Sequence, residues 1–329
     1  MSIWFWWIIL LLAVWAAHWG ADQLAEPLQK IREQWGLSAA AGGVLIAIAT
    51  ASPEVSTNTA SALQDATDIG VGNLLGSNII SVPAIVTVAY LATWMKTRTQ
   101  GRPLSQPSTH TLVVDELANP IQSYPYIIII ILVGILTLPA PWRGLQPIDG
   151  VIMLIAYIAY AGQAILRGRT GVQTVSWSRR EVVRAIGGVL ALVVAAYFTV
   201  RATEQIVVAL GISEVIGGLF ITATMSIVPE VFATWSIARS GQVTSATTSV
   251  IADNSVTMTL AFLPLALVST PIQDFQLFWV NLLFVGLLAI AYAAAIRINR
   301  GERGFGFGEI ILLNSIYIVY ILIMLLVVL

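Results

Sequence analysis

The sequence contains no cysteine and very few charged residues. Of its 329 residues, 10% are Asp, Glu, Lys or Arg and 57% are hydrophobic, whereas a soluble domain keeps roughly a quarter of its residues charged. Without cysteine the chain can form no disulfide, no thiolate metal site and no cysteine nucleophile. Because so few charges cannot cover a water-facing surface of this size, lipid must cover much of it.

Histidine and net charge are also scarce. The two histidines, His18 and His110, lie far apart in the sequence, which argues against a histidine-built metal site or proton relay. The net charge of −1 gives no indication of a nucleic-acid partner, and no motif predicts a cofactor. No lysine or arginine precedes the N-terminal apolar run, unlike in a secretory signal, so we expect this run to be a retained membrane span.

Long apolar stretches dominate the chain instead. Crossing the hydrocarbon layer of a membrane takes about 20 largely apolar residues as helix. About ten stretches qualify, so we predict an all-α polytopic membrane protein surrounded by the lipid bilayer. The predicted spans are 3–24, 36–64, 69–95, 123–141, 146–166, 182–203, 214–238, 246–269, 277–297 and 307–328.

The positions of the positive charges support this number of spans. With the N-terminus outside and ten crossings, fourteen of the 16 Lys and Arg residues fall on one side, which the positive-inside rule places in the cytoplasm. The chain is therefore predicted to lie in the cell (inner or plasma) membrane, with both termini outside and the 167–184 loop cytoplasmic. The opposite side keeps only Arg143 and Arg201. The fourteen are Lys30, Arg32, Lys96, Arg98, Arg102, Arg167, Arg169, Arg179, Arg180, Arg184, Arg239, Arg297, Arg300 and Arg303.

An Arg-rich connector divides the chain into two halves that share a motif. We predict a first five-helix half at 1–166, the connector at 167–181 and a second five-helix half at 182–329. The first half contains GGVLIAIATASPEV, ending at Val55, and the second contains GGLFITATMSIVPEV, ending at Val231. Under the predicted topology these stretches cross in opposite directions. The halves therefore form inverted repeats, in which each supplies one interrupted helix, as in many secondary transporters.

Each motif places an acid within the membrane directly after a proline. A carboxylate inside the bilayer costs at least ~2.5–3.5 kcal/mol, so Glu54 and Glu230 are expected to face the protein interior and to bind something. The proline removes a helix hydrogen bond and frees a carbonyl oxygen one turn earlier. A hydroxyl stands four residues before each acid, at Thr50 and Ser226. Carboxylate, hydroxyl and carbonyl oxygens are the ligands that hard cations such as Ca²⁺ prefer.

The span that follows each motif adds polar side chains at matching positions. Ser77 lies 23 residues after Glu54, and Asp253 lies 23 residues after Glu230. Spacing of i and i+4 places each set on one helical face. A buried glutamate can instead be protonated and hydrogen-bonded between helices, but two matched Pro-Glu pairs in inverted halves favour a cation site. The added candidate ligands are Ser77, Asn78 and Ser81 in the first half and Asp253, Asn254 and Thr257 in the second.

Two further polar stretches are interpreted as structural. Asp65 and Asp68 fall at the predicted outer end between the second and third spans. There we expect a solvated turn and a helix cap, or at most an access funnel for cations. The polar 97–123 segment is predicted to be a cytoplasmic linker.

At its two motifs the chain resembles the cation/Ca²⁺ exchanger superfamily, the sodium/calcium exchanger-like membrane proteins. Thr50, Pro53 and Glu54 match the family element Gly-Thr-Ser-x-Pro-Glu, and GNLLGSN matches its second element. In the second half Pro229 and Glu230 match.

The resemblance covers the whole chain in topology and is concentrated in 37–81 and 214–257. It implies ten spans in two inverted halves, with Glu54 and Glu230 as the central ligands that Ca²⁺ shares with its counter-ion.

Several positions depart from the family pattern. Ser81 and Thr257 stand where family members have Asn or Asp, and Asp253 takes the serine position of the second half. Ala51 and Ile227 replace the serine that follows the motif threonine. One carboxylate is thus moved by one helical turn. Both Na⁺ and H⁺ remain open as the counter-ion, because Asp253 can compensate for the lost sodium ligands or the glutamates can carry protons.

The sequence therefore predicts a secondary active cation antiporter rather than an enzyme, exporting Ca²⁺ in exchange for Na⁺ or H⁺ by alternating access. The alternative within transport is a channel or an antiporter of other specificity (Mg²⁺, Mn²⁺ or Na⁺/H⁺). The alternative from another class is an intramembrane hydrolase. Against it, no histidine lies near either glutamate, and the Tyr-Asp and Gly-x-Gly-Asp motifs of aspartyl proteases are absent.

Overall fold

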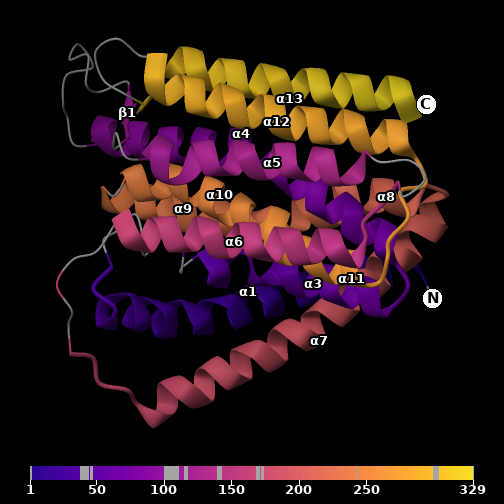
Figure 1. Ribbon diagram of the computed structural model, residues 1–329, viewed down its shortest axis with the longest axis horizontal. Helices are drawn as coiled ribbons and strands as arrows, with labels where there is room; N and C mark the ends of the chain where they lie inside the picture. The colour runs from indigo at the N-terminus through magenta and orange to yellow at the C-terminus, as the bar shows by residue number, and fades with distance from the viewer. Residues whose placement is uncertain are drawn as a thin grey trace.

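The structure is a computed structural model in which long helices lie side by side in one bundle (Figure 1). It describes residues 2–37, 44, 47–99, 111–114, 118–138, 143–167, 171, 174–241, 243–298 and 304–328. Within this part of the chain, nine helical segments are long and apolar enough to cross a membrane.

Three of these segments contain a stretch of π-helix as well as α-helix. The stretch η2 (Asn119–Ser123) precedes α5, η3 (Gly217–Thr222) joins α8 to α9, and η4 (Thr257–Ala261) joins α10 to α11. The α-helices are α1 (Ile3–Gln34), α3 (Ser52–Leu63), α4 (Thr67–Thr99), α5 (Tyr124–Thr137), α6 (Pro147–Arg167), α7 (Arg179–Leu210), α8 (Glu214–Ile216), α9 (Ala223–Ser240), α10 (Val243–Val256), α11 (Phe262–Leu267), α12 (Phe275–Ile298) and α13 (Phe307–Val328).

The predicted all-helical membrane fold is confirmed. Nine of the ten predicted spans coincide with the segments above. The other one, 36–64, crosses residues 38–43, 45 and 46, which lie outside the described part of the chain. Its described portion is helical at 47–50 and, after a turn at Ala51, in α3.

The two Pro-Glu motifs do not interrupt their spans in the same way, and this corrects the prediction of one interrupted helix in each half. Pro53 stands in the first turn of α3, just after the turn at Ala51, where a missing N–H costs no helix hydrogen bond. Pro229 lies inside the continuous helix α9. Membrane helices tolerate an internal proline because neighbouring groups satisfy the freed carbonyl. The second half departs from α-helical geometry earlier, in η3.

The centre of the bundle is the place where α4 of the first half crosses η3 of the second. A Cβ atom on Gly72 would lie 2.8 Å from the Gly218 Cα atom, and one on Gly218 would lie 2.3 Å from the Ile69 carbonyl oxygen. Helix backbones can approach this closely only where side chains are absent, as at the small-residue contacts of membrane proteins. The crossing therefore fixes the two halves against each other.

The first helices of the two halves, α1 and α7, form a second close pair. A Cβ atom on Gly20 would lie 2.7 Å from the Gly188 carbonyl oxygen. Leu192 and Ala195 of α7 pack in one buried cluster with Ala17 of α1. Figure 1 shows this pair along one side of the bundle, below α6.

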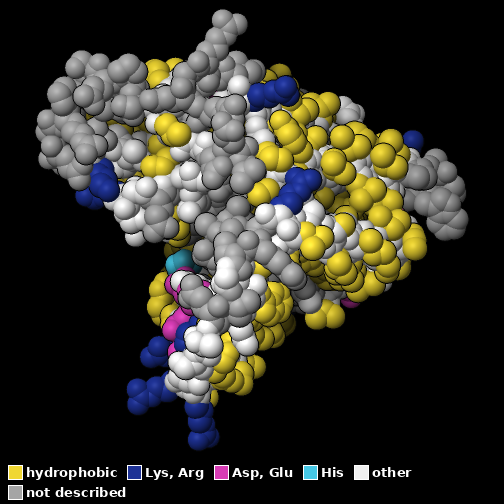
Figure 2. All heavy atoms as spheres, turned by 60° about the vertical axis from the view of Figure 1, so that its left-hand side comes forward, with side chains coloured by type: hydrophobic (Ala, Val, Ile, Leu, Met, Phe, Trp, Pro, Cys, Tyr) yellow, Lys and Arg dark blue, Asp and Glu magenta, His cyan; other side chains and the backbone are white. Residues whose placement is uncertain are grey.

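The helix ends with positive charge lie at one end of the bundle. Both chain termini lie at the right in Figure 1, whereas the ends of α4, α6, α9 and α12 that carry Lys96, Arg167, Arg239 and Arg297 lie at the left. Figure 2 shows Lys and Arg on this left-hand face, next to a flank of apolar side chains. This segregation agrees with the predicted topology, and which end faces the cytoplasm stays a prediction from the positive-inside rule.

A two-stranded antiparallel sheet connects two inter-helix segments at the same end. Strand β1 (Leu112–Val113), before α5, pairs with β2 (Gly304–Phe305), before α13. Leu112 lies opposite Phe305, and both side chains are buried. The sheet thus links the first half to the second by backbone hydrogen bonds.

Replacing Gly218 with alanine would place a methyl group against the Ile69 carbonyl. We expect the thermal unfolding midpoint of the purified protein to fall by the equivalent of about 1–3 kcal/mol, the usual cost of overpacking. Gly187→Ala is the control, since a Cβ atom there meets nothing within 4 Å, and it is expected to leave the midpoint unchanged or higher. Equal midpoints for the two variants would contradict the close helix crossing.

Candidate cation site

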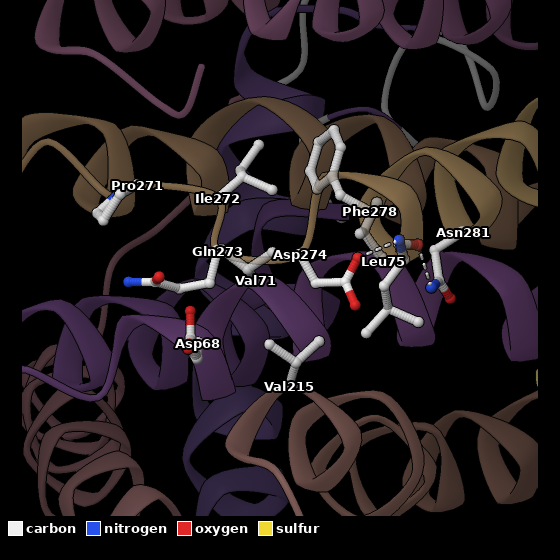
Figure 3. A pocket seen from close by; sticks show the side chains of 11 residues that line it. Asp68, Val71, Leu75, Val215, Pro271, Ile272, Gln273, Asp274, Phe278 and Asn281 are labelled. Atoms are coloured by element: carbon white, nitrogen blue, oxygen red, sulfur yellow. Dashed lines mark hydrogen bonds between the residues drawn. The ribbon is translucent and has the colours of Figure 1, made fainter. Parts of the chain in front are cut away.

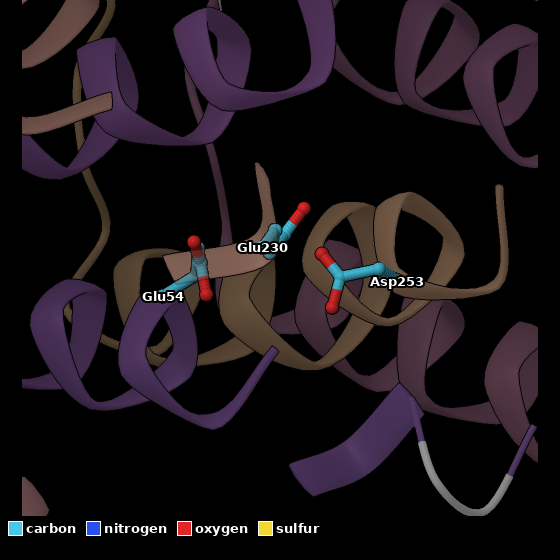
Figure 4. Close-up of side chains that lie close together, drawn as sticks. All are labelled: Glu54, Glu230 and Asp253. Atoms are coloured by element: carbon cyan, nitrogen blue, oxygen red, sulfur yellow. The ribbon is translucent and has the colours of Figure 1, made fainter. Parts of the chain in front are cut away.

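Three acidic side chains from the two halves meet inside the bundle. Glu54 lies in the first turn of α3, whereas Glu230 in α9 and Asp253 in α10 belong to the second half. One carboxylate oxygen from each lies within 4.8 Å of the other two. In Figure 4 the carboxylates of Glu230 and Asp253 point toward each other, and Glu54 lies beside them. The structure thus brings together the two glutamates that the sequence singled out and places Asp253 with them.

These carboxylates have no positively charged partner among the described residues. Glu54 is 2% exposed and Asp253 is 5% exposed, while Glu230 is partly buried. Glu54 Oε2 and Asp253 Oδ1 have no hydrogen-bond partner. Ion pairs elsewhere in the described part of the chain join Lys30 to Glu181 and Arg201 to Glu204, and His18 lies 3.5 Å from Asp22. Because unpaired buried charges cost several kcal/mol each, cations or protons must neutralise this cluster.

The backbone around the two glutamates differs between the halves. Glu54 follows Pro53 in the first turn of α3, where unpaired N–H groups and the positive end of the helix dipole favour a negative charge. Glu230 follows Pro229 within α9 and has no helix end beside it. There the proline removes the hydrogen bond that would reach the Met225 carbonyl. The first half therefore stabilises its carboxylate by N–H groups, and the second half supplies a free carbonyl.

The two motif hydroxyls lie one helical turn before the acids. The Thr50 hydroxyl and the Glu230 carboxyl are side-chain hydrogen-bond partners of Asp253. Thr50 Oγ1 also donates to the Ala47 carbonyl at 3.2 Å, and Thr50 is exposed. Ser226 lines a narrow crevice between α1, α3, α7 and α9. Thr50 is thus in contact with the carboxylate cluster, and Ser226 lies at the edge of the same region.

The two positions that depart from the family pattern already have protein partners. Ser81 Oγ donates to Asn254 Oδ1 at 3.0 Å, and Thr257 Oγ1 donates to the backbone carbonyl of Asp253 at 3.1 Å. All four residues are buried. Ser81 and Thr257 therefore present a hydroxyl oxygen where the family pattern has the carboxylate or amide oxygen of Asp or Asn.

The remaining predicted ligands differ in whether their polar atoms already have hydrogen-bond partners. Asn78 Nδ2 donates to the Leu74 carbonyl at 2.7 Å, and Asn78 Oδ1 accepts from the Tyr126 hydroxyl at 2.8 Å. Ser77 Oγ and Asn254 Nδ2 are buried without a partner. Asn78 is therefore held by two hydrogen bonds, whereas the Ser77 oxygen is still free to accept a hydrogen bond or contact a cation.

The sequence analysis missed a buried asparagine pair in the first half, which is hydrogen-bonded to the second half. Asn73 Nδ2 donates to Asn58 Oδ1 at 2.9 Å, and Asn58 Nδ2 donates to the Ala261 carbonyl at 3.2 Å. Both asparagines are fully buried, and Ala261 is the last residue of η4. The signal was present in the sequence, because Asn58 lies one helical turn after Glu54 and Asn73 belongs to GNLLGSN.

The donor atoms suit a hard divalent cation. The cluster offers three carboxylates and the neighbouring Thr50 hydroxyl, and all of these are oxygen ligands. Ca²⁺ takes six to eight oxygen ligands at 2.3–2.6 Å in flexible geometry. Zinc and copper sites use nitrogen and sulfur ligands instead, and the cluster contains neither histidine nor cysteine.

A second acidic recess lies at the end of the bundle that carries the chain termini. Asp68, Gln273 and Asp274 line it together with apolar side chains (Figure 3). Asp274 Oδ1 accepts from the Leu277 N–H at 2.8 Å and so caps the start of α12. Asp65 has a φ of 58° in the turn between α3 and α4. The turn expected at Asp65 is therefore present, and one of the two acids that line the recess serves as a helix cap.

Comparison with known proteins gives a family match over nearly the whole chain. The family model described as "Sodium/calcium exchanger protein" matches residues 4–166 and 181–326. The sodium/calcium exchanger MaX1 of Methanosarcina acetivorans is 38% identical over 91 residues, which are 27% of this chain and 26% of that protein. An uncharacterised membrane protein of Methanocaldococcus jannaschii is 21% identical over 235 residues, 70% of each chain.

Solved transporter structures share the fold. The sodium-calcium exchanger NCX_Mj superposes with a TM-score of 0.65 at 20% identity, covering 97% of this chain and 99% of that chain. The H⁺/Ca²⁺ exchanger CAX superposes with a TM-score of 0.70 at 15% identity, covering 95% of this chain and 79% of that chain. The inverted-repeat architecture is consistent with both structures.

If the three carboxylates bind one divalent cation together, Asp253→Asn is expected to weaken Ca²⁺ binding by about tenfold or more, because ligand charge sets Ca²⁺ affinity. The measurement is the rise in thermal unfolding midpoint of the purified protein as Ca²⁺ is added. Glu204→Gln serves as the control, since this acid pairs with Arg201 on α7, and its Ca²⁺ response should match that of the unaltered protein. An unchanged response in Asp253→Asn would contradict the shared site.

Proposed function

The chain belongs to the sodium/calcium exchanger protein family, and from this we propose that it exports Ca²⁺ by secondary active antiport, with Glu54, Glu230 and Asp253 as ligands. Family membership makes it a transporter of small cations in a membrane rather than an enzyme. The observation that carries the proposal is the meeting of three carboxylate oxygens within 4.8 Å of one another. It is supported by the absence of any Lys or Arg paired with them among the described residues.

Transport by alternating access follows from the origin of the ligands. Glu54 comes from the first half, whereas Glu230 and Asp253 come from the second. A cation held between two halves is released when one half moves relative to the other, as in other transporters with inverted repeats. The cation stabilises the occluded arrangement because it removes the repulsion among the carboxylates.

Protons are the counter-ion that the site supports best. When Ca²⁺ leaves, the carboxylates need another source of positive charge, and protons can bind to them without additional ligands. A sodium ion requires several further oxygens, and Ser81 and Thr257 supply one hydroxyl oxygen each where the family pattern has an Asn or Asp side chain. We therefore propose Ca²⁺/H⁺ exchange as the first candidate.

Sodium is the second candidate counter-ion. The Ser77 hydroxyl is buried and has no protein partner, so its oxygen can contact a sodium ion beside the carboxylates. The family name supports this candidate as well. The two candidates differ in which gradient drives Ca²⁺ movement.

Transport in vesicles tests both parts of the proposal. Purified protein in vesicles is expected to take up Ca²⁺ when a pH gradient is imposed and to be indifferent to a sodium gradient. Glu54→Gln and Glu230→Gln should lower uptake to the level of protein-free vesicles, because each removes a carboxylate that both ions need. Glu204→Gln is the control for the loss of an acid elsewhere. Uptake driven only by sodium would replace the first candidate with the second, and full activity of both glutamine variants would exclude this site.

Returning the displaced carboxylate to its family position tests the cause of the ion preference. In the double variant Asp253→Ser/Thr257→Asp, the total number of carboxylates is unchanged but one moves by a helical turn. We expect Ca²⁺ uptake in this variant to respond to a sodium gradient, whereas the single variant Asp253→Ser should lose uptake under either gradient. A double variant that still depends on protons alone would show that the position of the acid does not set the counter-ion.

A further inference from the structure

A groove between α5 and α6 combines apolar walls with a basic residue at its mouth. Its volume is about 530 Å³, within the roughly 300–1,000 Å³ of ligand pockets. One wall is formed by Pro120 of η2 and by α5 between Tyr124 and Leu132, and the other by the second half of α6. Arg167, the last residue of α6, stands at the mouth, at the same end of the bundle as the other basic helix ends.

At the mouth, the end of α6 is hydrogen-bonded to η2, the segment that precedes α5. There the Gln163 side chain donates to the Ile121 carbonyl at 2.9 Å, and Arg167 donates to the Pro120 carbonyl at 3.3 Å. These carbonyls belong to η2, whose π-helical geometry and proline set it apart from the regular helix that follows. Deeper in the groove α6 presents Ala156 and Ala159, which are too small to close the space.

The groove wall on α6 changes from charged to polar to apolar with depth. Tyr160, Gln163 and Arg167 share one helical face at i, i+3 and i+7. At a rise of 1.5 Å per residue, Gln163 lies about 6 Å and Tyr160 about 10 Å further into the bundle than Arg167. The Tyr160 ring lines the apolar part of this wall, while its buried hydroxyl lies beside Ser255 of α10. A phospholipid has the same order of groups along its length, namely a phosphate, ester carbonyls that accept hydrogen bonds, and an acyl chain.

The surfaces beside the groove face lipid. Ile131 of α5 is 56% exposed, and Ile155 and Ile158 of α6 are 59% and 61% exposed. In a membrane-spanning bundle, such apolar faces lie against acyl chains. The molecules with direct access to the groove are therefore membrane lipids.

We propose that the groove binds an anionic phospholipid, with its phosphate at Arg167 and one acyl chain lying along Ala159 and Ala156. Basic pockets between membrane helices at the cytoplasmic end favour anionic head groups. The guanidinium group can donate two parallel hydrogen bonds to a phosphate.

The groove also borders the elements that carry the cation site. Tyr157 and Tyr160 of α6 pack in one buried cluster with Ala51, next to Thr50, and with Ala252, next to Asp253. A lipid that fills the groove supports α6 against these segments. Anionic lipid is therefore expected to change the rate of Ca²⁺ transport, a consequence that rests on the proposed function, whereas lipid binding itself does not.

Lipid binding is tested on the full-length protein without any transported ion. The delipidated protein in detergent is titrated with phosphatidylglycerol or phosphatidylcholine, and bound lipid is counted by native mass spectrometry. We expect preferential binding of phosphatidylglycerol and about five-fold weaker binding in Arg167→Gln, the effect of losing one basic contact with an anionic lipid. Arg239→Gln is the matched control, because Arg239 is an exposed arginine at the same end of the bundle but does not line the groove.

A second variant tests the position of the acyl chain. Ala159→Trp fills the groove and should displace the lipid, whereas Ile155→Trp places the same ring on the exposed surface outside the groove and should not. Each variant is first checked for a single elution peak and an unchanged helical spectrum. Equal binding of the two lipids, or equal lipid retention by Arg167→Gln and the unaltered protein, would overturn the proposal. Transport of Ca²⁺ in vesicles with and without phosphatidylglycerol then reports separately on the rate effect.

Discussion

Repulsion among three carboxylates is the physical constraint on which the rest of the structure depends. Their oxygens lie within 4.8 Å of one another in a bundle surrounded by lipid, where Coulomb interactions are weakly screened. Such an arrangement is stable only with a cation or protons bound, because the bound positive charge removes the repulsion that destabilises the folded state. The glycine crossing of α4 with η3 and the hydrogen bond from Asn58 to the Ala261 carbonyl hold the two halves together while this repulsion pushes them apart.

The same constraint explains why the chemistry of the site is shared between the halves. Glu54 lies at a helix start whose N–H groups favour its charge, whereas Glu230 lies within a helix and has Asp253 as its neighbour. The second half thus carries more negative charge and less backbone compensation than the first. A bound cation therefore stabilises the second half more than the first. The same cation also contacts Glu54 and so couples the two halves.

Much of this architecture could be predicted from the sequence, because it follows from patterns with a strong physical cause. Apolar runs of membrane length gave the spans, and the segregation of Lys and Arg agreed with both termini at one end. The paired Pro-Glu motifs indicated Glu54 and Glu230 as partners. The different backbone at the two prolines could not be predicted, because Pro53 and Pro229 have nearly the same neighbours and only tertiary packing decides whether a helix starts or continues there. Likewise, the partners of Ser81 and Asn78 depend on side chains from distant helices, which spacing along one helix does not reveal.

The small β1–β2 sheet has a mechanical consequence. It joins the segment before α5 to the segment before α13 by backbone hydrogen bonds, with Leu112 opposite Phe305 and Val113 opposite Gly304. Gly304 has a φ of 152°, and a Cβ atom there would collide with the Leu112 carbonyl oxygen, so the contact leaves no room for slippage. The sheet is a fixed connection between the two repeats at the basic end of the molecule. Any rotation of one repeat against the other therefore has to take place about this connection.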